Sequence, residues 1–275
     1  MILTNAKVVL KNRIMSGSVA VHNGRIKHIT SDTLANGIDC KGLLVGPGFI
    51  DTHCHGGDNK WFFDDPVAAA NFHLQNGTTS MLASFWRNAA KGGLTGAVSK
   101  VTAAIESAQA PNLIGIHMEG PYIDKEFGSE GGTAHPIDSA EYRAIIKASN
   151  GFIKQWTFNP LQKGAAAFAQ VCFDKDIKLG ICYSKAAPAD IAEFAKFGLN
   201  IGNHIMCATG KPQTKFAGTI ESGSDEYVLS SDHMFAELIC DSLGAHVRHE
   251  NVVIVYRCKG ADRTMLVTDY CADGD

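Results

Sequence analysis

The feature that most constrains the fold is a regular alternation of short apolar runs with longer helical stretches, which begins at Gly48. The apolar runs are "GFIDTHCH", "TTSMLASF", "LIGIHMEG", "IKQWTFNP", "IKLGICYS", "LNIGNHIM", "FAELICDS" and "RTMLVTD". Helical candidates such as "DPVAAANFHLQNG" and "PADIAEFAKFG" fall between them. Eight strands that alternate with helices predict an α/β fold, a (β/α)8 barrel of the TIM type.

One segment of this alternation has two interpretations. "HENVVIVYRCKG" contains enough β-branched residues for a further strand, but its length and its Lys-Gly ending suit the seventh helix equally well. Periodicity alone leaves both open.

The first part of the chain has a different pattern. Apolar positions alternate in "AKVVL" and "GSVAVHNGRIKHI", and Asn23-Gly24 separates two alternating runs, which favours a type I′ hairpin turn. We therefore expect a small β module over residues 1–48 and a barrel over residues 49–275.

Composition excludes several classes of function. The net charge is −3 and the 25 basic residues form no extended cluster, so we expect neither nucleic-acid binding nor an anionic membrane surface as partner. No apolar run approaches the roughly 20 residues of a membrane helix. The eight cysteines are scattered without a C-x-x-C pair, which favours free thiols in a reducing cytoplasm.

Barrel enzymes place their active sites at the carboxyl ends of the strands. The residues at those ends are His53, His55, Glu119, Tyr183, His204 and Asp269. The pair in "DTHCH" is separated by one residue, so both imidazoles leave the same face of an extended strand and can hold one ion. An H-x-H pair alone can be only a polar strand end. In the first barrel strand, with carboxylates at neighbouring ends, it predicts a zinc-type site.

Several motifs carry a resemblance to a known family. "PGFIDTHCHGG", "HMEGPYI", "GGTAHP", "ICDSLGAHV" and "LVTD" occur in the order in which they occur in the amidohydrolase superfamily, and within it the chain resembles the N-acetylglucosamine-6-phosphate deacetylase family. The resemblance implies metal-dependent hydrolysis of an N-acetyl amide, an amino-sugar phosphate as small-molecule partner, a homodimer, and an N-terminal module that is part of a β-sandwich.

The resemblance also implies roles for individual residues. The implied metal ligands are His53, His55, Glu119, His204 and Asp269. The implied catalytic residues are Asp269, which carries the proton, and His135. Either His135 or the metal steadies the developing oxyanion. The implied substrate contacts are Ala134, His135, Cys207, Ala208, Lys215 and His246, with Arg248 near the phosphate. His117 is expected to pack or to support a ligand.

Two positions depart from the family pattern. Tyr183 stands where the family has a histidine ligand, and a phenol with a pKa near 10 is a poor ligand. We therefore expect one well-held metal, zinc by its ligand types, and a weakened second site. Cys207 stands where the family has asparagine, which favours an altered substrate.

Two alternatives remain beside deacetylation of N-acetylglucosamine 6-phosphate. One is an amidohydrolase that acts on another acetylated sugar phosphate or a cyclic amide. The other is a non-catalytic relative that binds a sugar phosphate. The second gains weight because the family's chain continues with a last barrel helix and further strands, so we expect a C-terminally truncated chain.

Overall fold

A computed structural model of the chain describes residues 1–86, 93–127 and 134–272. Gly131, Gly132 and Thr133 of the "GGTAHP" motif lie outside these residues. The chain divides into two compact units, Met1–Phe49 and Ile50–Asp275. Among the described helices, none is long and apolar enough to cross a membrane.

The first unit is a five-stranded sheet. Its strands are β1 (Ile2–Leu10), β2 (Arg13–His22), β3 (Arg25–Thr30), β4 (Ile38–Asp39) and β5 (Leu44–Val45). The sheet order is β3-β2-β1-β4, and β5 also pairs with β1. Alternate residues of β1 are buried, and Ala6, Val8 and Val19 form a small core, as the period-2 pattern predicts.

The predicted hairpin at Asn23-Gly24 is confirmed. β2 and β3 pair antiparallel, with His22 opposite Arg25 across the two-residue turn. Asn23 and Gly24 both have positive φ, 49° and 71°. A type I′ turn requires this conformation at both central positions.

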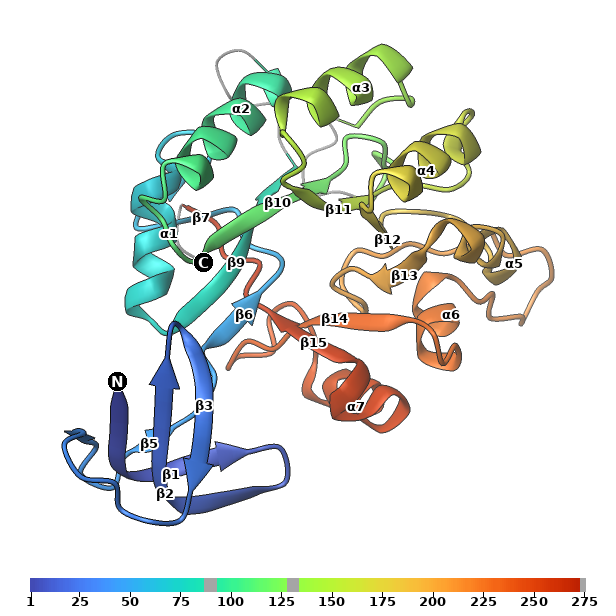
Figure 1. Cartoon of the computed structure of the whole chain (residues 1–275). Coiled ribbons are helices and arrows are strands. Elements are labelled where there is room, and N and C mark those ends of the chain that lie inside the picture. The colour runs from blue at the N-terminus through green and yellow to red at the C-terminus, as the bar shows by residue number, and fades with distance from the viewer. Residues whose placement is uncertain (87–92, 128–133, 273–275) are drawn as a thin grey trace. The chain divides into compact units, whose positions relative to one another are not determined.

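The second unit contains eight parallel strands in sequential order, β15-β14-β13-β12-β11-β10-β9-β6 (Figure 1). Their bounds are β6 (Phe49–Asp51), β9 (Thr78–Phe85), β10 (Leu113–Glu119), β11 (Ile153–Thr157), β12 (Lys178–Ile181), β13 (Leu199–Gly202), β14 (Phe235–Ile239) and β15 (Thr264–Val267). Each lies within one of the eight apolar runs. This arrangement confirms the predicted barrel.

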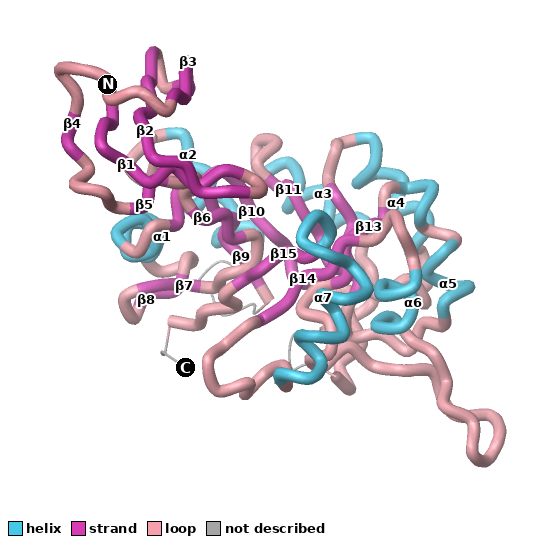
Figure 2. Tube along the Cα trace, turned by 90° about the horizontal axis from the view of Figure 1, so that it is seen from below, coloured by secondary structure: helices cyan, strands magenta, loops and turns pink. Residues whose placement is uncertain are grey.

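Helices follow the strands on the outside of the barrel (Figures 1 and 2). They are α1 (Pro66–Gln75), α2 (Gly93–Glu106), α3 (Ser139–Ala148), α4 (Ala165–Asp174), α5 (Pro188–Ala192), α6 (Ser224–Ser230) and α7 (His249–Arg263). A short hairpin of β7 (Gly56–Gly57) and β8 (Lys60–Trp61) precedes α1.

The segment with two interpretations is helical. It forms α7, which packs against β14 and β15, and Gly260 interrupts the helical geometry with φ 62°. The single helix expected over 188–198 is instead two short pieces, α5 and the 3-10 turn Ala195–Phe197. That turn ends at Gly198, whose left-handed φ of 81° stops further helical turns.

Hydrogen bonds beyond β6 and β15 join the first and last strands. The amide of Asp269 donates to the carbonyl of His53 at 2.9 Å, and the amide of His55 donates to the carbonyl of Tyr270 at 2.9 Å. Below them, the Thr268 hydroxyl donates to the buried carboxylate of Asp51 at 2.7 Å. The residues that close the barrel are therefore those that carry or flank the predicted site.

Candidate metal centre

Three of the predicted site residues share an unusual backbone conformation. Tyr183, His204 and Asp269 each lie two residues beyond the end of a strand, with φ of 47°, 27° and 50°. Non-glycine residues adopt positive φ at a cost of order 1 kcal/mol or more, and such residues gather at functional sites. Here the three polar side chains of the residues in this conformation lie at the same end of the barrel, where the strands finish.

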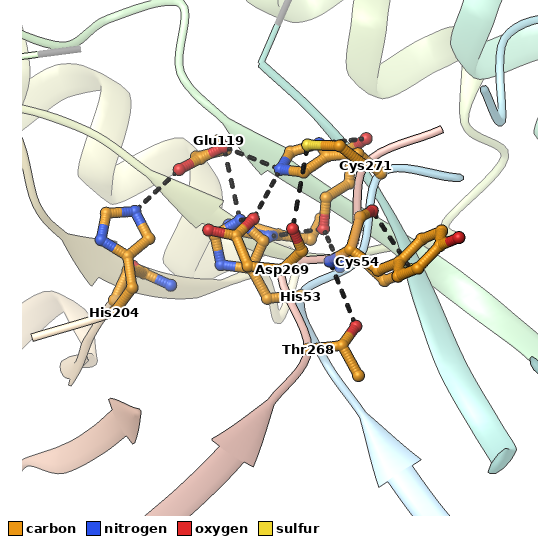
Figure 3. Close-up of polar contacts among 12 residues, drawn as sticks. His53, Cys54, Glu119, His204, Thr268, Asp269 and Cys271 are labelled. Carbon is orange, nitrogen blue, oxygen red and sulfur yellow. Dashed lines mark hydrogen bonds and ion pairs between the residues drawn. The ribbon is translucent and has the colours of Figure 1, made fainter. Parts of the chain in front are cut away.

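All five predicted metal ligands meet at this end, and Figure 3 labels His53, Glu119, His204 and Asp269 among them. Nε2 of His53 lies 3.3 Å from Oε2 of Glu119 and 3.5 Å from Oδ1 of Asp269. Nε2 of His55 lies 3.3 Å from the same Glu119 oxygen and 3.0 Å from the same Asp269 oxygen. His204 approaches the other oxygen of Glu119, with Nε2 2.8 Å from Oε1.

All three imidazoles are held through their Nδ1 atoms. Nδ1 of His53 lies 3.2 Å from a Glu237 oxygen, Nδ1 of His55 lies 3.2 Å from the Ser84 carbonyl, and Nδ1 of His204 lies 2.9 Å from the Cys207 carbonyl. Carbonyls and carboxylates only accept hydrogen bonds, so each Nδ1 donates. Each Nε2 is left facing Glu119.

These atoms fit a divalent metal ion. Zinc bonds to nitrogen and oxygen of about 2.0–2.1 Å in a tetrahedron place neighbouring ligand atoms about 3.3 Å apart. The four separations among His53, His55, Glu119 and Asp269 lie close to this value. Nε2 of His53 is also buried without a hydrogen-bond partner among the described residues, which a metal bond would satisfy. The predicted metal dependence thus has a matching donor set.

The charges of the cluster depend on one another. Burial opposes the charged form of His53, but the carboxylates of Glu119 and Asp269 raise its pKa well above the usual value. Burial likewise opposes ionisation of Glu119, but His53, His204 and His55 hold its pKa well below the usual value. A cation at this place would replace the imidazolium protons and keep both carboxylates ionised.

Tyr183 lies beside a second group that could hold a metal, which consists of His53, Glu119 and His204. Its hydroxyl donates to Oε1 of Glu119 at 3.1 Å, the oxygen that His204 also approaches. Burial, followed by the Glu119 charge, raises the pKa of the phenol. Tyr183 is therefore a neutral hydrogen-bond donor in this arrangement.

A third group that could hold a metal was not predicted. Asp51, Cys54 and His73 lie together beneath the site and are all buried. His73 Nε2 lies 2.7 Å from the Gly56 carbonyl, and Asp51 accepts hydrogen bonds from Thr268. Because their polar atoms already have protein partners, we interpret this group as structural.

The predicted substrate residues lie on surrounding loops. His135 is 42% exposed, with Nδ1 2.9 Å from the Pro136 carbonyl and Nε2 3.4 Å from Glu141. It lines a cavity of about 470 Å³ together with Ala134, Lys125 and Lys163. Among the hydrogen bonds of the described residues, none joins His135 to the metal ligands.

The remaining predicted substrate residues lie after β13 and β14. Cys207 is partly buried next to His204, and Ala208 follows it with a φ of 52°. Lys215 is exposed in the loop before α6. His246 is 40% exposed, and its amide and ring approach the carboxylate of Asp241. Asp241 also accepts from the amides of Leu243 and Ala245, so it shapes the loop that carries His246.

Sequence reasoning missed the buried polar layer beneath the ligands. Glu237 is fully buried in β14 and holds His53, while His117 lies between the hydroxyls of Ser84 and Thr157. Burial and the neighbouring His53 lower the pKa of His117 to about 3, so its role is that of a neutral packed residue. A single acidic residue inside the apolar run "FAELI" was the available signal for Glu237.

No protein-family model matches the chain. Among curated proteins, it is 28% identical to an N-acetylglucosamine-6-phosphate deacetylase of Lysinibacillus sphaericus, over 98% of this chain and 70% of the relative. It is 25% identical to an N-acetylgalactosamine-6-phosphate deacetylase of Shewanella, over 83% of this chain and 57% of the relative.

Solved structures of similar fold include two deacetylases. That of Thermotoga maritima N-acetylglucosamine-6-phosphate deacetylase has a TM-score of 0.80 and 25% identity, over 99% of this chain and 71% of that one. That of a Mycobacterium smegmatis variant, in complex with N-acetyl-D-glucosamine-6-phosphate, has a TM-score of 0.82 and 23% identity, over 98% and 70%. The predicted resemblance to deacetylases of the amidohydrolase kind is confirmed.

Proposed function

We propose that this relative of the N-acetylglucosamine-6-phosphate deacetylases is a metal-dependent hydrolase of N-acetylglucosamine 6-phosphate. Water adds to the acetyl carbon, the amide bond breaks, and the products are acetate and glucosamine 6-phosphate. The observation that carries the proposal is the set of close contacts that join His53 and His55 to Glu119 and Asp269 at the strand ends of a barrel, a fold shared with these enzymes.

We propose zinc as the metal and one site per chain. His53, His55, Glu119 and Asp269 would hold it, since imidazole and carboxylate at tetrahedral spacing suit zinc. When bound, such an ion polarises a carbonyl oxygen and lowers the pKa of water toward about 7. The second site is weakened, because the Tyr183 hydroxyl already donates to the Glu119 oxygen that a second ion would need.

Asp269 is the proposed proton carrier. Although burial opposes it, the neighbouring His53 and His55 keep the pKa of Asp269 below its usual value, so the carboxylate is ionised and able to accept a proton. Its side chain is 20% exposed, whereas those of His53 and Glu119 are buried. Asp269 is thus the ligand that a water molecule and a substrate can reach. It would take a proton from the attacking water and transfer it to the leaving amine.

The loops after the strands supply the proposed substrate contacts. Ala134 and His135 would face the acetyl group, with His135 as donor to the developing oxyanion. Cys207 and Ala208 would contact the sugar, and Lys215 and His246 the phosphate. A homodimer and a cytoplasmic location complete the proposal, both by analogy with the resembled family.

Acetate release from N-acetylglucosamine 6-phosphate tests this function. Wild type should release acetate, and Asp269→Asn should lower kcat at least about 100-fold, since it removes the proton acceptor and a charged ligand. Asp174→Asn, an exposed carboxylate on α4, is the matched control and should leave kcat unchanged.

Two results would contradict the proposal. Release of acetate from N-acetylgalactosamine 6-phosphate alone would assign the chain to the other sugar, as in the Shewanella relative. Absence of acetate from both sugars, with the sugar phosphate still protecting the fold against heat, would identify a non-catalytic binding protein.

A further inference from the structure

The carboxylate of Glu237 lies beneath the metal site and is completely buried. It accepts hydrogen bonds on both oxygens. Oε1 receives Gln155 at 2.9 Å and Thr52 at 3.3 Å, and Oε2 receives Asn203 at 2.7 Å and His53 at 3.2 Å. A buried carboxylate is costly unless its oxygens are satisfied, and here four donors converge on it from around the barrel.

The contacts of Glu237 fix the direction of a hydrogen-bond chain that leads away from it. Asn203 must present its amide NH2 to the carboxylate, so its carbonyl oxygen faces Thr157, whose hydroxyl donates to it at 2.7 Å. Having donated, the Thr157 hydroxyl accepts from Nε2 of His117 at 2.9 Å.

The other end of this hydrogen-bond chain is compatible with the same direction. The backbone amide of Cys54 donates to the Ser84 hydroxyl at 3.1 Å. That hydroxyl keeps its own proton, which it can donate to Nδ1 of His117 at 3.0 Å. With Nε2 as the donor and Nδ1 as the acceptor, His117 is neutral, and every hydrogen bond of this chain is satisfied.

The buried hydrogen-bonded residues around Glu237 allow the His53 ring only one orientation. Its Nδ1 can only donate to Glu237, so the lone pair of Nε2 points toward Glu119 and Asp269. The His117 ring packs edge-on against the His53 ring, with centroids 4.5 Å apart, and restricts its rotation. Gly180 leaves the room this layer requires, since an added Cβ would lie 2.0 Å from Oδ1 of Asn203.

We propose that Glu237 is a positioning residue of the metal site, which sets the tautomer and the ring orientation of His53 and raises its basicity toward the metal. A carboxylate that accepts from a metal-bound imidazole acts in this way, and its loss costs about 10- to 100-fold in metal affinity or activity. This inference rests on the metal site of the proposed function, although not on the reaction.

The positioning role of Glu237 is tested by the zinc affinity of the purified protein, which competition with a fluorescent chelator measures. Glu237→Gln keeps the shape but removes the charge, and should weaken zinc binding about 10- to 100-fold. Gln155→Leu is the matched control, since it removes a donor to the other oxygen and leaves the His53 contact. Its zinc affinity should stay within about threefold of wild type.

A second measurement applies even where Glu237→Gln fails to fold. In the zinc-loaded wild type, nitrogen NMR of His53, assigned by its loss in His53→Asn, should show a protonated Nδ1 and a metal-bound Nε2. Zinc bound through Nδ1, or a folded Glu237→Gln protein with unchanged zinc affinity, would overturn the proposal. Neither measurement depends on acetate release, so the failure of the deacetylase assignment would be seen separately.

Discussion

At the scale of single residues, function here depends on how side chains are turned at strand ends. Tyr183, His204 and Asp269 each adopt a left-handed conformation two residues past a strand, and each contacts another site residue. Each of these conformations costs free energy locally, and the surrounding barrel stabilises it. We propose that the side chain at position 183 sets how many ions the site can hold.

Position 183 offers a direct test of that point. Tyr183→His would place an imidazole beside His204 and Glu119, and should raise the metal content from about one to about two equivalents per chain, because three good ligands would then surround the second position. Metal analysis after gel filtration measures this. Tyr183→Phe, which removes the hydroxyl without adding a ligand, should stay at about one equivalent. Equal metal content in both variants would show that another feature limits the second site.

The proposed ligands were easier to find in the sequence than the residues that support them. His53, His55, Glu119 and Asp269 were recognisable because polar residues at strand ends interrupt apolar runs. Glu237 and Asn203 were not. A single buried acid in a strand, or a single amide just after one, reads the same in the sequence whether it packs, caps or orients a neighbour. Only their distances in the folded chain distinguish these roles.

At the scale of elements, the first and last strands are joined through the residues that form the site. The strands β6 and β15 are short, and closure continues beyond them through the paired backbones of residues 53–55 and 269–270. Thr268 and the buried Asp51 strengthen the junction. Strand order could be predicted from the alternation of runs, whereas this junction could not, because it depends on a register between segments about 215 residues apart.

The junction should contribute measurably to stability. Thr268→Val leaves the buried Asp51 without its shortest hydrogen bond, and should lower the free energy of unfolding of the metal-free protein by about 1–3 kcal/mol. Urea unfolding followed by tryptophan fluorescence reports it, since all three tryptophans lie in the barrel unit. Thr219→Val, at an exposed position of the same unit, should change it by less than about 0.5 kcal/mol. A similar small loss in both variants would mean that the Thr268 contact stabilises nothing.

At the scale of the whole molecule, one unit is a small sheet and the other a barrel with its polar groups gathered at one end. The alternation of strands and helices predicted the barrel because each run is apolar enough to be buried on both faces. The pattern over 249–263 suits a helix or a strand, since β-branched residues occur in both, and the segment is a helix that packs against β14 and β15.

We propose that one bound ion per chain is sufficient for deacetylation. The measurement that tests it most directly is the rate of acetate release from N-acetylglucosamine 6-phosphate, while metal-stripped protein is titrated with zinc. We expect no release without metal, a linear rise in rate as zinc is added, and a plateau at about one equivalent per chain. A plateau only at two equivalents, or no acetate at any zinc loading, would contradict it.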